Sequence, residues 1–175
     1  YDMEYYIDYY ESPLTRITLG SDGNALIGLW LEGQKYYCEK FSKEAKRKDL
    51  DVFNETKEWL DIYFSGENPG FTPKLNEQGS DFRHEVWEIL KRIPYGKTTT
   101  YGQIANELAF NRACPRMSCQ AVGGAVGHNP ISIIIPCHRV IGQNGNLTGY
   151  AGGVDLKIKL LQIEGIDTSR LFYKY

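Results

Sequence analysis

The feature that most constrains the fold of this sequence is a break in its hydrophobic pattern at residues 66–79, which are rich in Gly, Pro and Asn. Before this break, short runs of strand-forming residues alternate with turns, whereas after it the apolar residues recur at helical spacing. A chain of 175 residues is long enough for two small domains. The sequence therefore predicts an N-terminal domain with its linker over residues 1–79 and a C-terminal domain over residues 80–175.

The N-terminal part of the chain has the pattern of a sheet covered by one helix. Three strand runs are separated by turns such as residues 21–24, and they predict an antiparallel meander. Across residues 51–64 the apolar side chains recur at helical spacing, and Gly66 provides a stop signal. We therefore expect an α/β domain with an antiparallel sheet. The strand runs are residues 4–10, 16–19 and 25–31.

The C-terminal part contains start signals for three short helices. Ser80 caps the first helix, residues 100–103 (Thr-Tyr-Gly-Gln) form a capping box for the second, and Ser118 caps the third. Two short helices joined by a turn are typical of a helix-turn-helix motif. A packed helical hairpin fits the same spacing, because the connecting loop is longer than the usual tight turn.

Further signals surround Cys137. The apolar run of residues 131–135 predicts a short buried strand, Asn144-Gly145 predicts a turn, and residues 154–163 predict a last helix closed by Gly165. The expected fold class is thus an α/β N-terminal domain followed by a mostly α C-terminal domain with a helix-turn-helix.

Charge and cysteine content limit the classes of function. Residues 1–82 contain 9 Lys and Arg against 16 Asp and Glu, whereas residues 83–175 contain 11 against 6. This asymmetry is expected if only the second half meets a polyanion, although a solvated surface gives the same balance. The four cysteines lack the spacing of a disulfide scaffold or a zinc site, and no apolar run is long enough to cross a bilayer. We therefore expect the protein to use no metal and no cofactor and to have no membrane partner. We expect it in the cytoplasm or, in a eukaryote, in the nucleus.

The residues best suited to chemistry are the adjacent pair Cys137 and His138. A free thiol has a pKa of about 8.5, so a nucleophilic cysteine needs a base or a positive field nearby. Neighbouring side chains on an extended segment point to opposite faces. A direct hydrogen bond between Cys137 and His138 would therefore need a turn, and otherwise a water molecule must bridge them; we favour the bridging water. The alternative interpretation is a buried core cysteine beside a surface histidine.

The sequence around this pair, Pro136-Cys137-His138-Arg139-Val140, resembles residue for residue the active-site motif of the O6-alkylguanine-DNA alkyltransferases, or methylated-DNA–protein-cysteine methyltransferases. The resemblance runs from about Phe82 to Glu164 and is weaker over residues 1–80. It implies a ribonuclease H-like N-terminal domain. It also implies DNA repair by irreversible, single-turnover transfer of an alkyl group to Cys137 from O6 of guanine, or from O4 of thymine. Other matching segments are residues 93–96, 100–103, 121–125, 129–130 and 149–153.

The resemblance also assigns roles to individual residues. Cys137 would be the nucleophile, His138 its water-mediated base, Glu164 the acid that orients His138, and Asn129 the brace of the turn before Cys137. The residues implied to bind the guanine are Tyr101, Val140, Tyr150, Ala151 and Gly152. The residues implied to contact DNA are Tyr101, Gly102, Arg116, Ser118, Cys119, Gln120 and Gly123.

The implied partner is double-stranded DNA carrying O6-alkylguanine, bound by a monomer through the minor groove with the damaged base flipped out of the helix. The family usually places an arginine at the second position of the recognition helix to fill the vacated space. This sequence has Gln120 there, which keeps amide hydrogen bonds but adds no positive charge. The preceding loop looks longer than in better-known members, and its Arg112 and Arg116 are candidates for phosphate contacts.

Three other functions share parts of this pattern. A thiol hydrolase would use the same cysteine and histidine but would turn over repeatedly, whereas a thioether formed by alkyl transfer has no good leaving group. A non-catalytic binder of alkylated DNA would need no nucleophile. A helix-turn-helix regulator would discriminate among unmodified sequences through the major groove.

The position of Gln120 yields a testable prediction. Gln120→Arg should tighten binding to duplex DNA and steepen its salt dependence, because it adds a positive charge near the phosphates, and each phosphate charge that is neutralised releases about one counterion. The dissociation constant measured at several salt concentrations checks this prediction. Unchanged affinity throughout that series would discard it.

Overall fold

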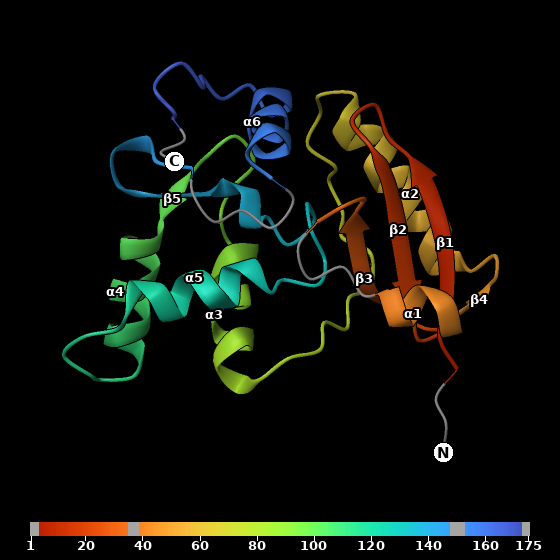
Figure 1. The fold of residues 1–175 in the computed structure, drawn as a ribbon, viewed down its shortest axis with the longest axis horizontal. Helices are drawn as coiled ribbons and strands as arrows, with labels where there is room; N and C mark the ends of the chain where they lie inside the picture. Colours follow the sequence, from red (N-terminus) through yellow and green to blue (C-terminus); the bar gives the residue numbers. More distant parts are fainter. Residues whose placement is uncertain (1–3, 35–38, 148–152, 173–175) are drawn as a thin grey trace. The chain divides into compact units, whose positions relative to one another are not determined.

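The structure, a computed structural model, describes residues 4–34, 39–147 and 153–172 (Figure 1). Its first three strands form the antiparallel meander that the sequence predicts. They are β1 (Tyr6–Glu11), β2 (Arg16–Ser21) and β3 (Leu26–Leu31), and each pairs with its neighbour in the chain. A two-residue strand, β4 (Lys46–Arg47), joins β1 in parallel, so the sheet of order β3-β2-β1-β4 is mixed. The expectation of a purely antiparallel sheet was wrong here, because so short a strand has no periodicity to detect.

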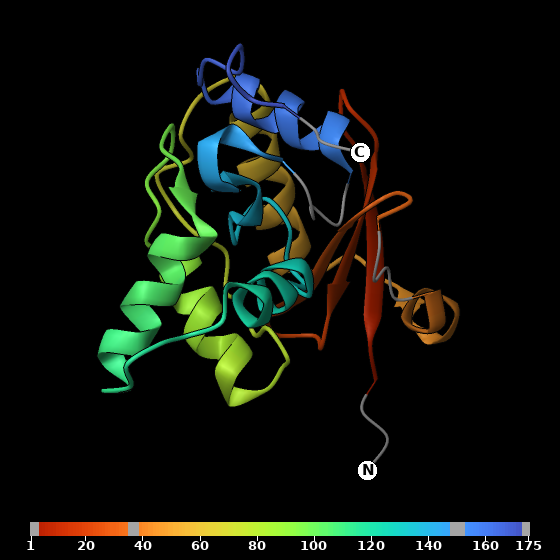
Figure 2. The same cartoon turned by 60° about the vertical axis from the view of Figure 1, so that its left-hand side comes forward.

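Helices lie on both faces of this sheet (Figure 2). α2 (Asp51–Phe64) covers one face, as predicted, and buries Phe53, Leu60 and Tyr63 completely. Burial of each such side chain stabilises the fold by roughly 1.5–3 kcal/mol. The short helix α1 (Glu39–Glu44) lies on the opposite face. The apolar residues at helical spacing in residues 51–64 therefore form the side of α2 that packs against the sheet.

Three helices begin at the residues that the sequence predicts. They are α3 (Asp81–Lys91), α4 (Tyr101–Asn111) and α5 (Cys119–Gly127), capped by Ser80, Thr100 and Ser118. In each case the hydroxyl oxygen accepts the backbone N–H three residues further on, at 3.3, 3.1 and 3.2 Å respectively. The second cap is a full capping box with Gln103, also as predicted. Each cap is worth about 1 kcal/mol, which matters for helices this short.

Packing of these helices centres on Trp87 of α3. Its side chain is fully buried, and its indole N–H donates to the backbone oxygen of Ala125 in α5 at 2.9 Å. A buried indole usually finds such a partner, and the bond fixes α5 against α3. α4 packs on the same two helices and is joined to α5 by residues 112–118. The pair α4 and α5 is the one that the sequence predicts as a helix-turn-helix.

The segment before Cys137 corrects a sequence-based expectation. Residues 131–135 are not a strand: only Ile131 forms a β-bridge, residues 132–134 are a turn, and Cys137 opens the 3-10 helix η1 (Cys137–Arg139). An apolar run signals burial but not backbone direction. Pro130 and Pro136, which cannot donate to a sheet ladder, bracket the run. The segment is buried as expected, but it turns.

The rest of the chain contains a strand pair that the sequence analysis did not predict, followed by the predicted turn and last helix. β6 (Val140–Ile141) pairs in parallel with β5 (Thr99–Thr100), which brings the start of α4 beside η1. The predicted turn is the short 3-10 helix η2 (Gln143–Gly145). α6 (Val154–Ile163) is the predicted last helix. Among the described residues, no helix has both the length and the apolar character that a membrane span requires.

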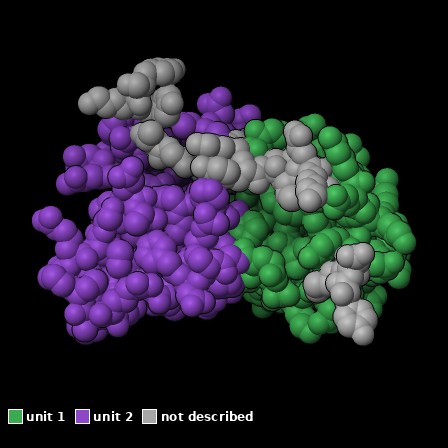
Figure 3. All heavy atoms as spheres, turned by 60° about the horizontal axis from the view of Figure 1, so that its bottom comes forward, with its two compact units in different colours: residues 1–78, 130–132 green, residues 79–129, 133–175 purple. Residues whose placement is uncertain are grey.

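The contacts divide the chain into two units (Figure 3). The first unit consists of residues 1–78 together with residues 130–132, and the second of residues 79–129 and 133–175. The sequence-based boundary after residue 79 placed residues 130–132 in the C-terminal domain. In the structure these residues belong with the β-sheet, because residue 131 bridges to β3.

Candidate active site

Cys137 sits at the start of η1, in a backbone turn that is braced on its N-terminal side. Cys137 is 4% exposed, and its backbone N–H donates to the backbone oxygen of Ile135 at 2.8 Å. The buried side-chain amide of Asn129 donates to the same oxygen at 2.7 Å. One carbonyl thus receives two donors, which closes the turn and holds the backbone of Cys137 in place. Asn129 therefore lies where the brace implied by the sequence should be.

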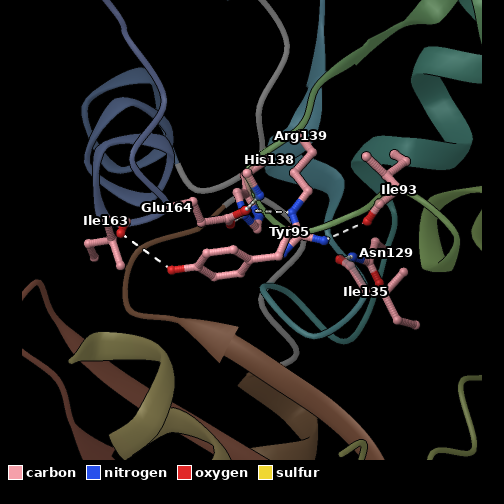
Figure 4. Close-up of polar contacts among 9 residues, drawn as sticks. Ile93, Tyr95, Asn129, Ile135, His138, Arg139, Ile163 and Glu164 are labelled. Carbon is pink, nitrogen blue, oxygen red and sulfur yellow. Dashed lines mark hydrogen bonds and ion pairs between the residues drawn. The ribbon is translucent and has the colours of Figure 1, made fainter. Parts of the chain in front are cut away.

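His138 and Glu164 are both buried in the second unit, and their side chains point toward each other (Figure 4). The Nε2 of His138 lies 2.5 Å from Oε2 of Glu164, and neither side chain is exposed. The other carboxylate oxygen accepts from Nε of Arg139 at 2.8 Å and from the N–H of Gly96 at 2.9 Å. A carboxylate with three such donors is a strong, charge-assisted anchor. It joins the end of α6 to η1 and to the turn after α3.

The electrostatics of this cluster favour a neutral imidazole beside a charged carboxylate. Burial lowers the pKa of His138 below its ordinary value, although the hydrogen bond that His138 donates to Glu164 opposes this shift. Burial alone would raise the pKa of Glu164, but the hydrogen bonds from His138 and Gly96 and the charge of Arg139 lower it to about 2. With the Nε2 hydrogen donated to Glu164, the lone pair of the neutral ring is at Nδ1. His138 is therefore held in the tautomer that a general base needs.

Arg139 supplies the positive charge that balances Glu164. Besides that ion pair, its Nη1 donates to the oxygen of Ile93 at 2.7 Å, and its guanidinium lies 5.7 Å from the centre of the Tyr95 ring. A rigid planar fork suits such a set of partners better than a lysine would. The sequence analysis quoted Arg139 within its motif but gave it no role. Its signal was a charged residue placed directly after a reactive pair.

Lys157 is a second residue that the sequence analysis missed. It is fully buried on α6, and its Nζ donates to the oxygen of Val140 at 2.5 Å. Burial lowers its pKa to about 8, while the charge of a Cys137 thiolate opposes that shift. The signal was present, because Lys157, Leu160, Leu161 and Glu164 share one helical face and the lysine interrupts its apolar part. Val140, implied to bind the guanine, thus already has one donor at its carbonyl.

Tyr101, in the second unit, interacts electrostatically with Cys137 and also lines a cavity. Burial and the charge of a Cys137 thiolate raise the pKa of its phenol to about 12, so the hydroxyl is a proton donor at neutral pH. Tyr101, Gly102 and Cys119 line one cavity of about 540 Å³, together with Thr100, Gln103, Asn106 and Gln143. Three of the residues implied to contact DNA therefore meet at one cavity between the starts of α4 and α5.

The other implied contacts lie elsewhere or beyond the described residues. Arg116, Ser118 and Gln120 are exposed at and before the start of α5, and Gly123 is half-buried one turn further on. The candidate phosphate contact Arg112 pairs with Glu85 at 2.8 Å instead, so its charge is already partly balanced. Tyr150, Ala151 and Gly152, implied to close over the guanine, lie outside the described residues. Within the described part of the chain, no group of three or more His, Cys, Asp or Glu side chains is placed to hold a metal ion.

This arrangement can perform one kind of chemistry well. A buried cysteine has a neutral histidine as its neighbour in sequence, a fixed carboxylate behind that histidine, and a buried ammonium group nearby. These are the components of an activated thiol nucleophile, with the base oriented by a third group. The adjoining cavity is lined by amide, hydroxyl and thiol side chains.

Comparison with known proteins gives matches over both parts of the chain. Residues 81–166 match the DNA binding domain of 6-O-methylguanine DNA methyltransferase, and residues 5–76 match the ribonuclease-like domain of the same protein family. These matches confirm the predicted combination of an α/β N-terminal domain with a helical C-terminal domain.

Individual relatives are about 40% identical to this chain along nearly its whole length. A methylated-DNA–protein-cysteine methyltransferase of Methanosarcina acetivorans is 42% identical over 168 residues, which cover 91% of this chain and 98% of that protein. One from Haemophilus influenzae is 40% identical over 162 residues, covering 92% and 87%. The crystal structure of Mycobacterium tuberculosis OGT in complex with DNA has a TM-score of 0.77 and 39% identity, and covers 96% of this chain and 94% of that one.

The buried carboxylate generates a prediction about acid stability. Glu164→Gln keeps the side-chain size but leaves the buried Arg139 without its counter-charge, so the free energy of unfolding at pH 7 should fall by about 3 kcal/mol. In the unchanged protein, a carboxyl pKa lowered from 4.5 to about 2 stabilises the fold above pH 4.5. That stabilisation is lost as the pH falls toward 2, so the gap between the two proteins should narrow in acid.

Urea unfolding between pH 7 and pH 3 measures this gap. Glu88→Gln is a suitable control, because Glu88 forms an exposed pair with Lys91 at 2.8 Å in the same unit and should contribute little. A gap between Glu164→Gln and the unchanged protein that stays constant with pH would contradict the assignment of a charged Glu164.

Proposed function

This chain belongs to the 6-O-methylguanine DNA methyltransferase family and repairs O6-methylguanine in DNA, and we propose that Cys137 is the residue that accepts the methyl group. The observation that carries the proposal is the buried array of His138, Glu164 and Arg139 that begins one residue after a buried cysteine. The reaction is a direct transfer to the protein, as in a methylated-DNA–protein-cysteine methyltransferase. The thioether it forms has no good leaving group, so each chain acts once.

In the proposed reaction, the sulfur of Cys137 attacks the methyl carbon on O6 of the guanine. The S–C bond forms as the C–O6 bond breaks, and the electron pair of that bond passes to the purine. The thiol proton moves through a water molecule to Nδ1 of His138, whose ring is oriented by Glu164. The purine takes up one proton in turn. Tyr101, whose phenol stays protonated at neutral pH, is the proposed donor to the departing base; its phenolate then regains a proton from water as His138 releases its own to water.

We further propose that a monomer binds double-stranded DNA with α5 in the minor groove. Chemistry at O6 needs the base to be rotated out of the stack, which costs a few kcal/mol and leaves a gap. The exposed Gln120 at the start of α5 would fill that gap with its amide. Exposed Ser118 and Arg116 just before it would contact phosphates near the helix N-terminus, where backbone N–H groups favour anions.

Two outcomes distinguish this function from its rivals. With an excess of O6-methylguanine duplex, transfer should stop at one methyl group per protein, whereas a thiol hydrolase would continue. A non-catalytic binder would leave the methyl group on the DNA. Intact-protein mass spectrometry over time separates the three cases.

The central prediction concerns Cys137 itself. Cys137→Ser should abolish methyl transfer, because a serine hydroxyl is far less acidic than a thiol, while binding to methylated duplex should persist. Peptide mass spectrometry should find the methyl group at residue 137 of the unchanged protein. Cys114→Ser, which alters another free thiol of the second unit that is not among the implied DNA contacts, is the matched control and should still react. Methyl transfer by Cys137→Ser would overturn the proposal.

A second prediction concerns Lys157. Its ammonium group favours the thiolate of Cys137, so Lys157→Met should slow single-turnover transfer about tenfold near pH 7, the effect of roughly one pKa unit on the thiol. Because the pKa of Lys157 is lowered to about 8, the unchanged protein loses this charge as the pH rises through 8. The two rates should therefore converge at higher pH.

Transfer rates from pH 6 to pH 9.5 test this expectation. Lys159→Met, an exposed lysine on the same helix, should leave the rate unchanged at every pH. A ratio between the unchanged protein and Lys157→Met that does not vary with pH would rule out an electrostatic role for Lys157.

A further inference from the structure

Residues 130–132 extend the sheet of the first unit, only a few residues before the reactive cysteine. The N–H of Leu29 in β3 donates to the oxygen of Pro130 at 2.9 Å, and the N–H of Ser132 donates to the oxygen of Leu29 at 3.0 Å. Leu29 and Ile131 are thus partners in a parallel β-bridge. β3 is an edge strand of its sheet, so this segment occupies backbone groups that an edge would otherwise expose.

A buried side-chain contact locks the same segment. The hydroxyl of Ser132 donates to Oε1 of Gln34 at 3.3 Å, and that oxygen also accepts the N–H of Leu31 at 2.7 Å. Gln34 is 6% exposed and Ser132 4% exposed. One amide oxygen therefore ties the end of β3 to the segment before the active site. We call this contact the Gln34–Ser132 latch.

The chain between the latch and Cys137 has little freedom. Ile133 is fully buried with φ at 70°, a left-handed conformation that a β-branched residue adopts only when its surroundings enforce it. Two residues later, the oxygen of Ile135 is held by Asn129 and by the N–H of Cys137. The backbone of residues 133–137 is thus constrained at Ile133 and at Ile135, between the latch and Cys137.

We propose that the first unit positions Cys137 for attack, with Gln34 and Ser132 as positioning residues that act through the backbone of residues 133–137. This inference rests on the proposed function of Cys137 and assigns a task to a domain for which the sequence suggested only scaffolding. Methyl transfer requires the sulfur to meet the methyl carbon in line with the breaking bond. Small displacements are costly in such a step, and a misplacement of about 1 Å can slow a reaction about a hundredfold.

The test compares three variants with a matched control. Ser132→Ala, Gln34→Leu and the double variant each remove the latch. Ser21→Ala removes another buried hydroxyl of the first unit, which donates to the oxygen of Ala25 at 2.6 Å. The measurements are the single-turnover rate on a duplex containing O6-methylguanine, the affinity for that duplex, and the urea midpoint.

We expect each latch variant to transfer methyl about tenfold more slowly with unchanged DNA affinity. The double variant should be no slower than the slower single variant, because both changes break one contact. Ser21→Ala should lose a similar amount of stability and keep its rate. Equal slowing by Ser21→Ala and Ser132→Ala would show that the rate follows stability alone, and would overturn the proposal, as would additive slowing in the double variant.

Hydrogen exchange gives a readout that does not depend on activity. The backbone amides of residues 133–137 should exchange faster in Ser132→Ala and Gln34→Leu, and at the unchanged rate in Ser21→Ala. If the unchanged protein failed to methylate Cys137, the proposed function would be wrong. The exchange data would still show whether the Gln34–Ser132 latch holds the backbone of residues 133–137. Unchanged exchange in both latch variants would refute the positioning role.

Discussion

The second unit depends on one buried carboxylate. Glu164 follows α6 in the chain, yet its two oxygens bind the imidazole of His138, the guanidinium of Arg139 and the N–H of Gly96. A charge removed from water must recover its hydration from the protein, and three donors with one formal counter-charge do so. Because the donors come from η1 and from the turn after α3, the same interactions that satisfy the charge also set the geometry around Cys137. Stability and reactivity therefore share these bonds.

The ionisable groups near the cysteine are held in different protonation states. Burial keeps His138 neutral and Tyr101 protonated, whereas Glu164 is held ionised by its donors. Lys157 is a buried cation near Cys137, and its pKa is lowered to about 8. Arg139 is occupied by Glu164. When the surroundings of two ionisable groups move their pKa values apart, the groups can take different roles, such as base and proton donor.

Sequence reasoning succeeded where the deciding interactions are local. The meander, α2 and the three capped helices were predicted because turn residues, helical spacing and cap hydroxyls act within a few positions of each other. It failed for β4, for the turn at Ile133 and for the buried contacts of Gln34 and Lys157, whose partners are distant in the chain. The pair Cys137 and His138 was singled out through its motif, since spacing alone did not distinguish it from a core cysteine beside a surface histidine. Glu164 likewise depended on the resemblance, because nothing local connects it to His138.

The path of the chain through residues 129–137 passes from the second unit to the first and back again before it reaches Cys137. Asn129 belongs to the second unit and braces Ile135, whereas Leu29 and Gln34 of the first unit hold residues 130–132. The strained Ile133 lies where the chain passes from one unit to the other. Strain of this kind, about 1–3 kcal/mol, persists only if flanking contacts outweigh it, and those contacts are present on both sides. A protein that uses its cysteine once gains nothing from fast turnover, so a rigidly held nucleophile carries no disadvantage in product release.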